Sequence, residues 1–102
     1  MNNKFLQFLG LTKRAGKLRE GYNTSEDIIK HRKAKLIVIS EDASENTKNK
    51  FKAYCNKYNI AIIVAYGKEE LGQILGRSEV NVVCITDEKM SSKLIELWNE
   101  KI

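Results

Sequence analysis

The sequence predicts an α/β fold, a three-layer α/β/α sandwich around a small mixed sheet of about four strands. Short apolar runs typical of buried strands alternate with segments of helical periodicity along the chain. The 102 residues suffice for one compact core and not for two, so we expect residues 1–102 to form a single domain. The chain contains no proline, and no linker, internal repeat or low-complexity segment interrupts the alternation.

The first third of the chain predicts two helices joined by a short extended piece. Residues 3–15 show helical spacing of apolar side chains and are followed by Gly16, a residue that commonly ends helices. Residues 24–33 predict the second helix, with Asn23 or Thr24 as its N-cap. The apolar face of the first helix comprises Phe5, Phe8, Leu9 and Thr12. Charges that suit the dipole of the second helix are Glu26 and Asp27 in its first turn and His31, Arg32 and Lys33 in its last.

The remaining chain predicts three strands alternating with three helices. Residues 36–39 form a continuous apolar run, which is typical of a strand covered on both faces. The further elements are a helix over 44–58, a second buried strand over 60–64, a short helix over 68–75, a strand over 80–85 and an amphipathic helix over 88–100. This order favours helices on both faces of the sheet.

The positive charge is concentrated near the start of the chain. The net charge is +5, and residues 1–35 carry nine Lys/Arg against three Asp/Glu, a balance of +6. Residues 36–102 carry nine against ten, a balance of −1. This asymmetry favours a surface that faces a polyanion, and a solvated basic surface is the alternative interpretation.

The sequence argues against an enzyme, a metal centre or a bound cofactor. The single histidine, His31, lies at a basic helix end and has no partner for acid–base or nucleophilic chemistry. Gly67 and Lys68 follow a strand but lack the other glycine and the hydroxyl residue of a phosphate-binding P-loop. Glu41 and Asp42 have no evident third ligand, and we expect them to cap a turn.

The cysteines and the hydropathy of the chain indicate the cellular compartment in which we expect the protein. Cys55 and Cys84 lack the spacing of a metal or redox pair, so we expect buried thiols in a reducing environment. No apolar run approaches the roughly 20 residues of a membrane helix, and no signal-peptide pattern opens the chain. We therefore expect a soluble cytoplasmic protein without a membrane partner, and a monomer.

The segment between Lys13 and Lys35 is where the pattern indicates a ligand. Cations surround Gly16 and Gly21, and a helix begins just after Gly21, where unpaired N–H groups suit phosphate oxygens. Gly21 permits close approach of a nucleic acid, and Asn23 offers both a donor and an acceptor to a base edge. A purely structural interpretation, with two turn glycines and a capping asparagine, remains open at this point. The clustered cations are Lys13, Arg14, Lys17 and Arg19.

Four stretches carry a resemblance to a known family, and that resemblance covers nearly the whole chain. They are Phe8–Leu18, Gly21–Asn23, Ala34–Ser44 and Leu71–Gly76. As a set they resemble the YlxQ-like ribosomal proteins of the kink-turn RNA-binding superfamily (L-seven-Ae and L-thirty-e type). The resemblance implies an α/β/α sandwich without catalytic activity that recognises a sharply kinked RNA helix containing sheared G·A pairs. The partners it implies are structured RNA, ribosomal RNA or another kink-turn RNA, and ribosomal proteins.

The resemblance also implies site residues. It places Asn23, at the end of the turn formed with Gly21 and Tyr22, against a guanine edge. Thr24 stands where many relatives have glutamate or glutamine. Asp27 stands where many have lysine, an unfavourable change beside RNA for which Lys30 offers partial compensation.

A second contact surface is implied in the loop over residues 76–80. There Arg77 is expected to hold a phosphate and Val80 to pack on a splayed base, while Glu79 fits RNA poorly. The phosphate contacts expected overall are Lys13, Arg14, Lys17, Arg19, Lys33 and Arg77. Two alternatives stay open: a protein-interaction adaptor of the same fold with weakened RNA binding, marked by Glu26 and Asp27, and a small-molecule or nucleotide-binding enzyme.

Overall fold

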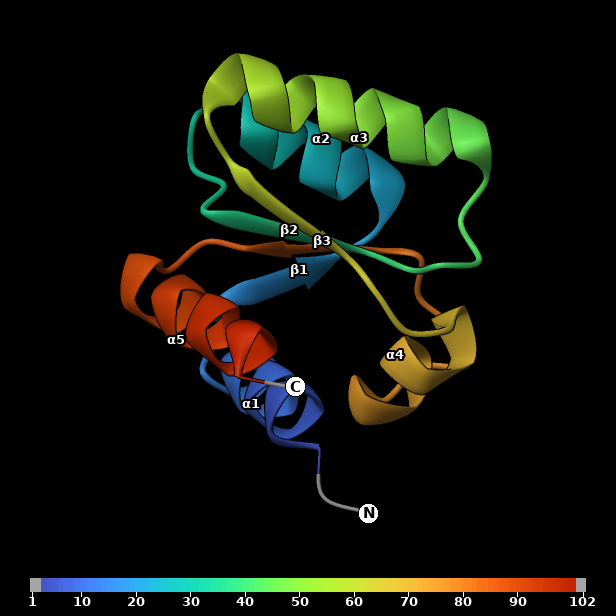
Figure 1. Ribbon diagram of the computed structural model, residues 1–102, viewed down its shortest axis with the longest axis vertical. Helices are drawn as coiled ribbons and strands as arrows, with labels where there is room; N and C mark the ends of the chain where they lie inside the picture. Colours follow the sequence, from blue (N-terminus) through green and yellow to red (C-terminus); the bar gives the residue numbers. More distant parts are fainter. Residues whose placement is uncertain (1–2, 101–102) are drawn as a thin grey trace.

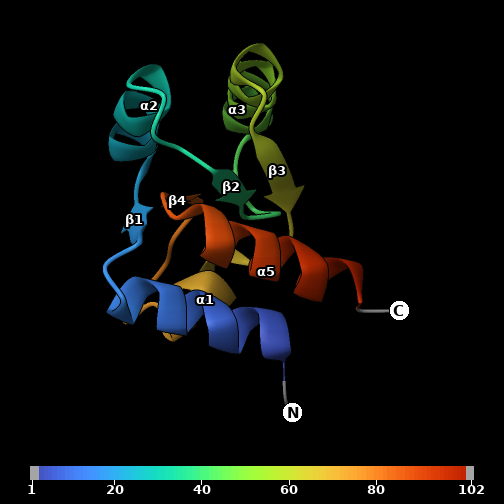
Figure 2. The same ribbon diagram turned by 90° about the vertical axis from the view of Figure 1, so that its left-hand side faces the viewer.

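The computed structural model describes residues 3–100, and these form five helices and a four-stranded sheet. In Figures 1 and 2, α2 and α3 cover one face of the sheet, and α1, α4 and α5 cover the other. This arrangement confirms the predicted three-layer α/β/α sandwich. The elements are α1 (Lys4–Arg14), β1 (Leu18–Glu20), α2 (Tyr22–Lys30), β2 (Leu36–Ile39), α3 (Glu45–Tyr58), β3 (Ala61–Val64), α4 (Lys68–Ile74), β4 (Val82–Ile85) and α5 (Glu88–Asn99).

The sheet is mixed, with the strand order β1-β4-β2-β3. β4 runs antiparallel to both β1 and β2, whereas β2 and β3 are parallel. All residues of β2 and β4 are buried, as expected for central strands covered on both faces. The strand predicted over 60–64 is confirmed as β3, but its predicted burial is wrong, because β3 is an edge strand in which Ala61 is exposed and only Ile63 is buried.

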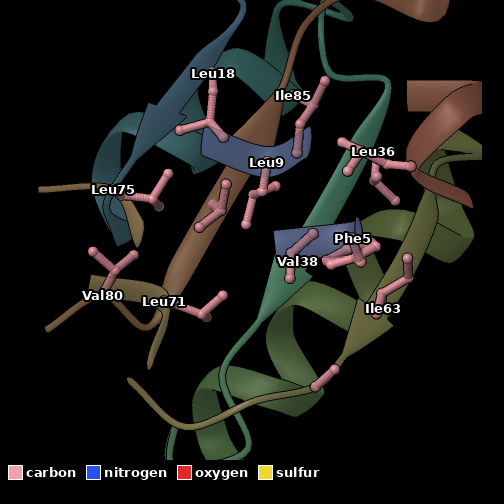
Figure 3. Close-up of a cluster of buried hydrophobic side chains, with 13 residues drawn as sticks. Phe5, Leu9, Leu18, Leu36, Val38, Ile63, Leu71, Leu75, Val80 and Ile85 are labelled. Carbon is pink, nitrogen blue, oxygen red and sulfur yellow. The ribbon is translucent and has the colours of Figure 1, made fainter. Parts of the chain in front are cut away.

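Two apolar layers hold the helices to the sheet. On the α1, α4 and α5 side, Phe5 and Leu9 pack with side chains of the strands and of α4 (Figure 3). On the α2 and α3 side, Phe51 is fully buried, and Cys55 and Cys84 belong to the same cluster. Burial raises the pKa of Cys55 to about 11 and, together with the neighbouring Cys55 thiol, that of Cys84 to about 12. Both cysteines are therefore buried neutral thiols, as predicted.

The boundaries of α2 differ from the predicted ones at both ends. The helix begins at Tyr22 with Gly21 as its N-cap, so neither Asn23 nor Thr24 caps it as expected. The N–H of Gly21 donates to the carbonyl of Val82, which extends the β1–β4 pairing and sets the point where the chain turns into the helix. His31 is the C-cap, and Arg32 and Lys33 lie beyond the helix. β4 likewise begins at Val82, two residues after the predicted start.

Candidate nucleic-acid interface

The first turn of α2 presents polar groups to solvent. Gly21 has φ 113° and ψ 152°, a backbone conformation open essentially to glycine alone, and no side chain caps the helix. The first N–H groups of α2 therefore lack a side-chain acceptor and suit phosphate or base oxygens. Asn23 and Thr24 are both exposed on this turn. The turn expected to read RNA thus combines open N–H donors with an exposed amide.

Aromatic contacts fasten this end of α2 to α3. The ring centroid of Tyr22 lies 5.1 Å from that of Phe51 at an interplanar angle of 85°, an edge-to-face arrangement. The ammonium of Lys50 on α3 lies 5.9 Å from the Tyr22 ring centroid. Tyr22 is half-buried, so it supports the position of the helix end and also borders the cleft described below.

The two acidic residues of α2 lie in different surroundings. Glu26 accepts a hydrogen bond from the Tyr54 hydroxyl, which lowers the pKa of the Glu26 carboxyl with smaller help from Lys30 and Lys50. Asp27 is 74% exposed, and its Oδ1 lies 3.5 Å from His31 Nδ1.

Asp27 borders the reading turn, because it follows Asn23 by four residues and so shares its side of the helix. Lys30, expected to compensate for Asp27, instead has its ammonium 5.9 Å from the Tyr54 ring centroid. It therefore belongs to the contact with α3.

A cleft of about 430 Å³ opens beside the first turn of α2. Its walls are the Gly21–Tyr22 turn, the loop between β2 and α3, and the loop between α4 and β4. Its charged lining consists of the carboxylates of Glu20 and Glu79 and the guanidinium of Arg77. The cleft therefore has its own counterions.

Glu20 is the central charged group of the cleft, and it was not among the expected site residues. Its side chain is 9% exposed, with Oε2 2.7 Å from Lys13 Nζ and Oε1 3.3 Å from Arg77 Nε. Lys13 also donates to the carbonyl of Leu75 at the end of α4. The alternation in β1 offered a signal, since Glu20 must lie on the same face of the strand as buried Leu18 and needs a partner there.

The loop between α4 and β4 folds back tightly over α4. A Cβ atom at Gly72 would lie 2.7 Å from Glu79 Cα and 2.8 Å from the Arg77 carbonyl oxygen, so only glycine fits. The Arg77 N–H donates to the Gly72 carbonyl at 2.8 Å. Val80, expected to pack on a base, is 5% exposed within the core and offers little surface, although it forms part of the cleft wall.

The expected phosphate contacts do not form one continuous cationic edge. Arg77 lines the cleft, and Lys13 lies beside it through their shared partner Glu20. Arg14 borders a separate groove between α1 and α5. The other three, Lys17, Arg19 and Lys33, lie near the opposite end of α2, where Arg19 and Lys33 line a groove with Thr86 and the Lys17 carbonyl accepts from the Thr86 N–H.

Among residues 3–100, no three His, Cys, Asp or Glu side chains are grouped to hold a metal ion. Asp42 accepts a hydrogen bond from the Lys68 N–H at 2.9 Å and so caps the start of α4, in line with the turn-capping role expected of it. No helix in this described part of the chain has the length and apolar character required to cross a membrane.

Comparison with known proteins places this geometry in context. Residues 3–95 match the profile of the ribosomal protein L7Ae/L30e/S12e/Gadd45 family. The chain is 34% identical over 94 residues to the RNA-binding protein YlxQ of Bacillus subtilis, covering 92% of this chain and 94% of that protein. It is 30% identical over 95 residues to the large ribosomal subunit protein eL8 of Caenorhabditis elegans, covering 87% of this chain and 36% of that protein. A solved structure of a protein with unknown function from Bacillus halodurans matches with a TM-score of 0.94 at 31% identity, covering 97% of this chain and 100% of that one.

Proposed function

The chain belongs to the ribosomal protein L7Ae/L30e/S12e/Gadd45 family, and on this premise we propose that it binds a kinked RNA helix without catalysing a reaction. The observation that carries the proposal is the open first turn of α2, with its uncapped N–H groups and the exposed Asn23 amide. Asn23 directly follows Gly21 and Tyr22, which line the cleft. Its ligand is a kink-turn with sheared G·A pairs in ribosomal or other structured RNA. The protein then acts in the cytoplasm as a monomer, at the ribosome and beside ribosomal proteins.

A kink is what makes base reading feasible for this surface. The major groove of a regular RNA duplex is deep and narrow, and side chains do not reach base edges there. A sharp bend opens the groove to a helix end, so Asn23 reaches a guanine edge while the N–H groups of α2 bind neighbouring oxygens. Arg77 holds a backbone phosphate at the other wall of the cleft.

A gel-shift comparison tests this proposal. The probes are a standard kink-turn RNA and the same RNA with its G·A pairs replaced by Watson–Crick pairs. Wild type is expected to prefer the kinked RNA, and Asn23→Ala to weaken that binding by roughly 1–3 kcal/mol, about 5- to 150-fold, because a base-reading pair is lost. Asn56→Ala, an exposed asparagine in the last turn of α3, is the matched control. Equal binding of both RNAs by wild type would overturn the proposal.

A second candidate function is a protein-interaction adaptor of the same fold. The 74% exposed carboxylate of Asp27 favours it, because a negative charge beside the reading turn opposes RNA phosphates. Ionic strength distinguishes the two functions. RNA binding falls steeply with added salt, whereas an apolar protein contact changes little.

A further inference from the structure

A second groove, here called the distal groove, lies at the C-terminal end of α2, away from the cleft. Its volume is about 410 Å³, and its lining comprises Arg19, Ile28, Arg32, Lys33, Lys35 and Thr86. Four of these six residues are cationic and none is acidic. Within residues 3–100, none of the four cations forms an ion pair with a carboxylate. The distal groove is therefore a concentrated positive surface without internal counterions.

Main-chain pairing fixes the segments that carry these cations. Arg19 lies in β1 opposite Cys84 of β4, and Figure 2 shows α2 standing over β1. The Lys35 N–H donates to the Ile85 carbonyl at 2.8 Å, and the Thr86 N–H donates to the Lys17 carbonyl at 2.9 Å. Binding therefore requires ordering of side chains only, which keeps its entropic cost low.

Arg32 has a left-handed backbone conformation at the end of α2. The Lys33 N–H donates to the Ile28 carbonyl and the Arg32 N–H to the Ile29 carbonyl, which is the hydrogen-bond pattern of a Schellman motif. This motif usually has glycine in its left-handed position, yet Arg32 occupies that position with φ 61°. Glycine would adopt this conformation with less strain than arginine. Its guanidinium lies 5.2 Å from the Tyr58 ring centroid.

The chemistry of the distal groove matches several phosphates spaced along a strand. Four cations over 410 Å³ exceed the need of one phosphate, and Arg19 and Arg32 each offer a planar fork that suits phosphate oxygens. The nine residues of α2 span about 14 Å at ~1.5 Å each, so the cleft and the distal groove are separated by the length of one short helix. A duplex held at the cleft therefore passes within reach of the distal groove.

We propose that the distal groove is a second RNA-binding surface, which holds backbone phosphates of the helix flanking the kink. This inference rests on the proposed function in that RNA is the ligand, but it requires no base edge and no kink. The two surfaces then have different roles. The cleft selects the kinked site, and the distal groove contributes affinity that is independent of sequence.

The test is the salt dependence of binding to two RNAs, a kink-turn and a straight duplex of equal length. Arg32→Gly combined with Lys35→Ala removes two cations. It is expected to reduce the slope of log Kobs against log salt by up to about 1.8 for both RNAs. The ratio of the RNA affinity of wild type to that of the variant then falls about tenfold between about 50 and 200 mM salt. The preference of the variant for the kinked RNA is expected to equal that of wild type. Lys52→Ala with Lys89→Ala removes the same charge from exposed positions on α3 and α5 and is the matched control.

The outcomes separate this inference from the proposed function. A slope equal to that of the control variant overturns the distal groove, whatever the preference for kinked RNA. A reduced slope without any such preference in wild type sustains the distal groove and overturns the kink-turn proposal. Polyglutamate competing as well as RNA of equal charge assigns the distal groove to an acidic protein instead. Lys33→Ala with Lys35→Ala repeats the measurement with the Arg32 backbone left intact.

Discussion

The two ends of α2 differ in how their cations are neutralised. At the N-terminal end, Lys13 and Arg77 share the carboxylate of Glu20, whose side chain is 9% exposed. At the C-terminal end, none of the cations of the distal groove forms an ion pair with a carboxylate among the described residues. An ion pair inside the protein holds a cation in place but reduces its attraction for a phosphate, whereas an unpaired cation retains that attraction. One short helix therefore has paired cations at one end and, within the described part of the chain, unpaired cations at the other, as the proposed division between base reading and phosphate binding requires.

The largest effect is expected from a substitution that displaces the α4–β4 loop at the cleft but leaves the distal groove in place. Gly72→Ala forces a Cβ into the backbone at Glu79 and Arg77, and it is expected to lower the free energy of unfolding by about 1–3 kcal/mol. Because the loop that carries Arg77 must move, preference for kinked RNA falls while binding to straight duplex persists. Chemical denaturation and gel shift measure the two effects.

Gly10→Ala is the control for that substitution. Its Cβ would meet Ile74 at 3.4 Å, an ordinary contact, and alanine favours the helix by up to about 1 kcal/mol. Unaltered stability of Gly72→Ala, or a parallel loss of binding to both RNAs, would contradict the separation of the two ends.

A smaller effect is expected when the cations of the cleft lose their carboxylate partner, as the cations of the distal groove have none among the residues described. Glu20→Gln keeps the shape of the side chain but frees Lys13 and Arg77 from their counterion. We expect a cost of about 1 kcal/mol in unfolding free energy, because both cations are partly exposed and solvent screens the pair. The salt slope for RNA should steepen by up to about 0.9, since one negative charge leaves the interface.

Glu79→Gln is the control for stability: it removes one negative charge from the same cleft, so it should steepen the salt slope similarly, but it breaks only a surface ion pair. Glu79 lines the same cleft but pairs with Lys68 at 3.6 Å on the surface, so its loss should leave stability within about 0.5 kcal/mol. The salt series and a denaturation curve for each variant provide the comparison. Weaker RNA binding by Glu20→Gln would mean that holding Arg77 in place outweighs the charge removed.

The layers of the fold were predictable from the sequence because they depend on local apolar patterns. Continuous apolar runs such as those of β2 and β4 predict strands that are covered on both faces, and both strands are central and fully covered in the sheet. The N-cap of α2 was not predictable in this way. Asn23 and Thr24 have the stronger capping preference, but pairing of Gly21 with Val82 decides where the helix starts.

The candidate site was predictable only in part. The sequence shows that residues 13–35 are rich in cations, but it does not show where these cations lie. The segment includes the residues before and after α2, so its cations lie at both ends of the helix. The Glu20–Arg77 pair joins residues far apart in sequence, and its existence depends on where the α4–β4 loop folds. Local patterns carry no information about such a contact. The absence of ion pairs in the distal groove, within residues 3–100, was not predictable for the same reason. It depends on the positions of all the carboxylates in the fold.

The smallest expected effect concerns the middle of α2, which joins both ends to α3. The Tyr54 hydroxyl donates to Glu26 and is the main cause of the lowered pKa of that carboxyl. A carboxyl whose pKa is lowered by folding stabilises the folded state above its ordinary pKa of 4.5, and this contribution disappears as the pH falls through the folded value. Tyr54→Phe should therefore lose less stability than wild type between neutral pH and pH ~3.5 in chemical denaturation. Tyr58→Phe, at the end of the same helix, should follow wild type. If Tyr54→Phe also follows wild type, the hydrogen bond does not anchor α2, and other contacts between α2 and α3, such as the edge-to-face pair of Tyr22 and Phe51, hold the helix in place.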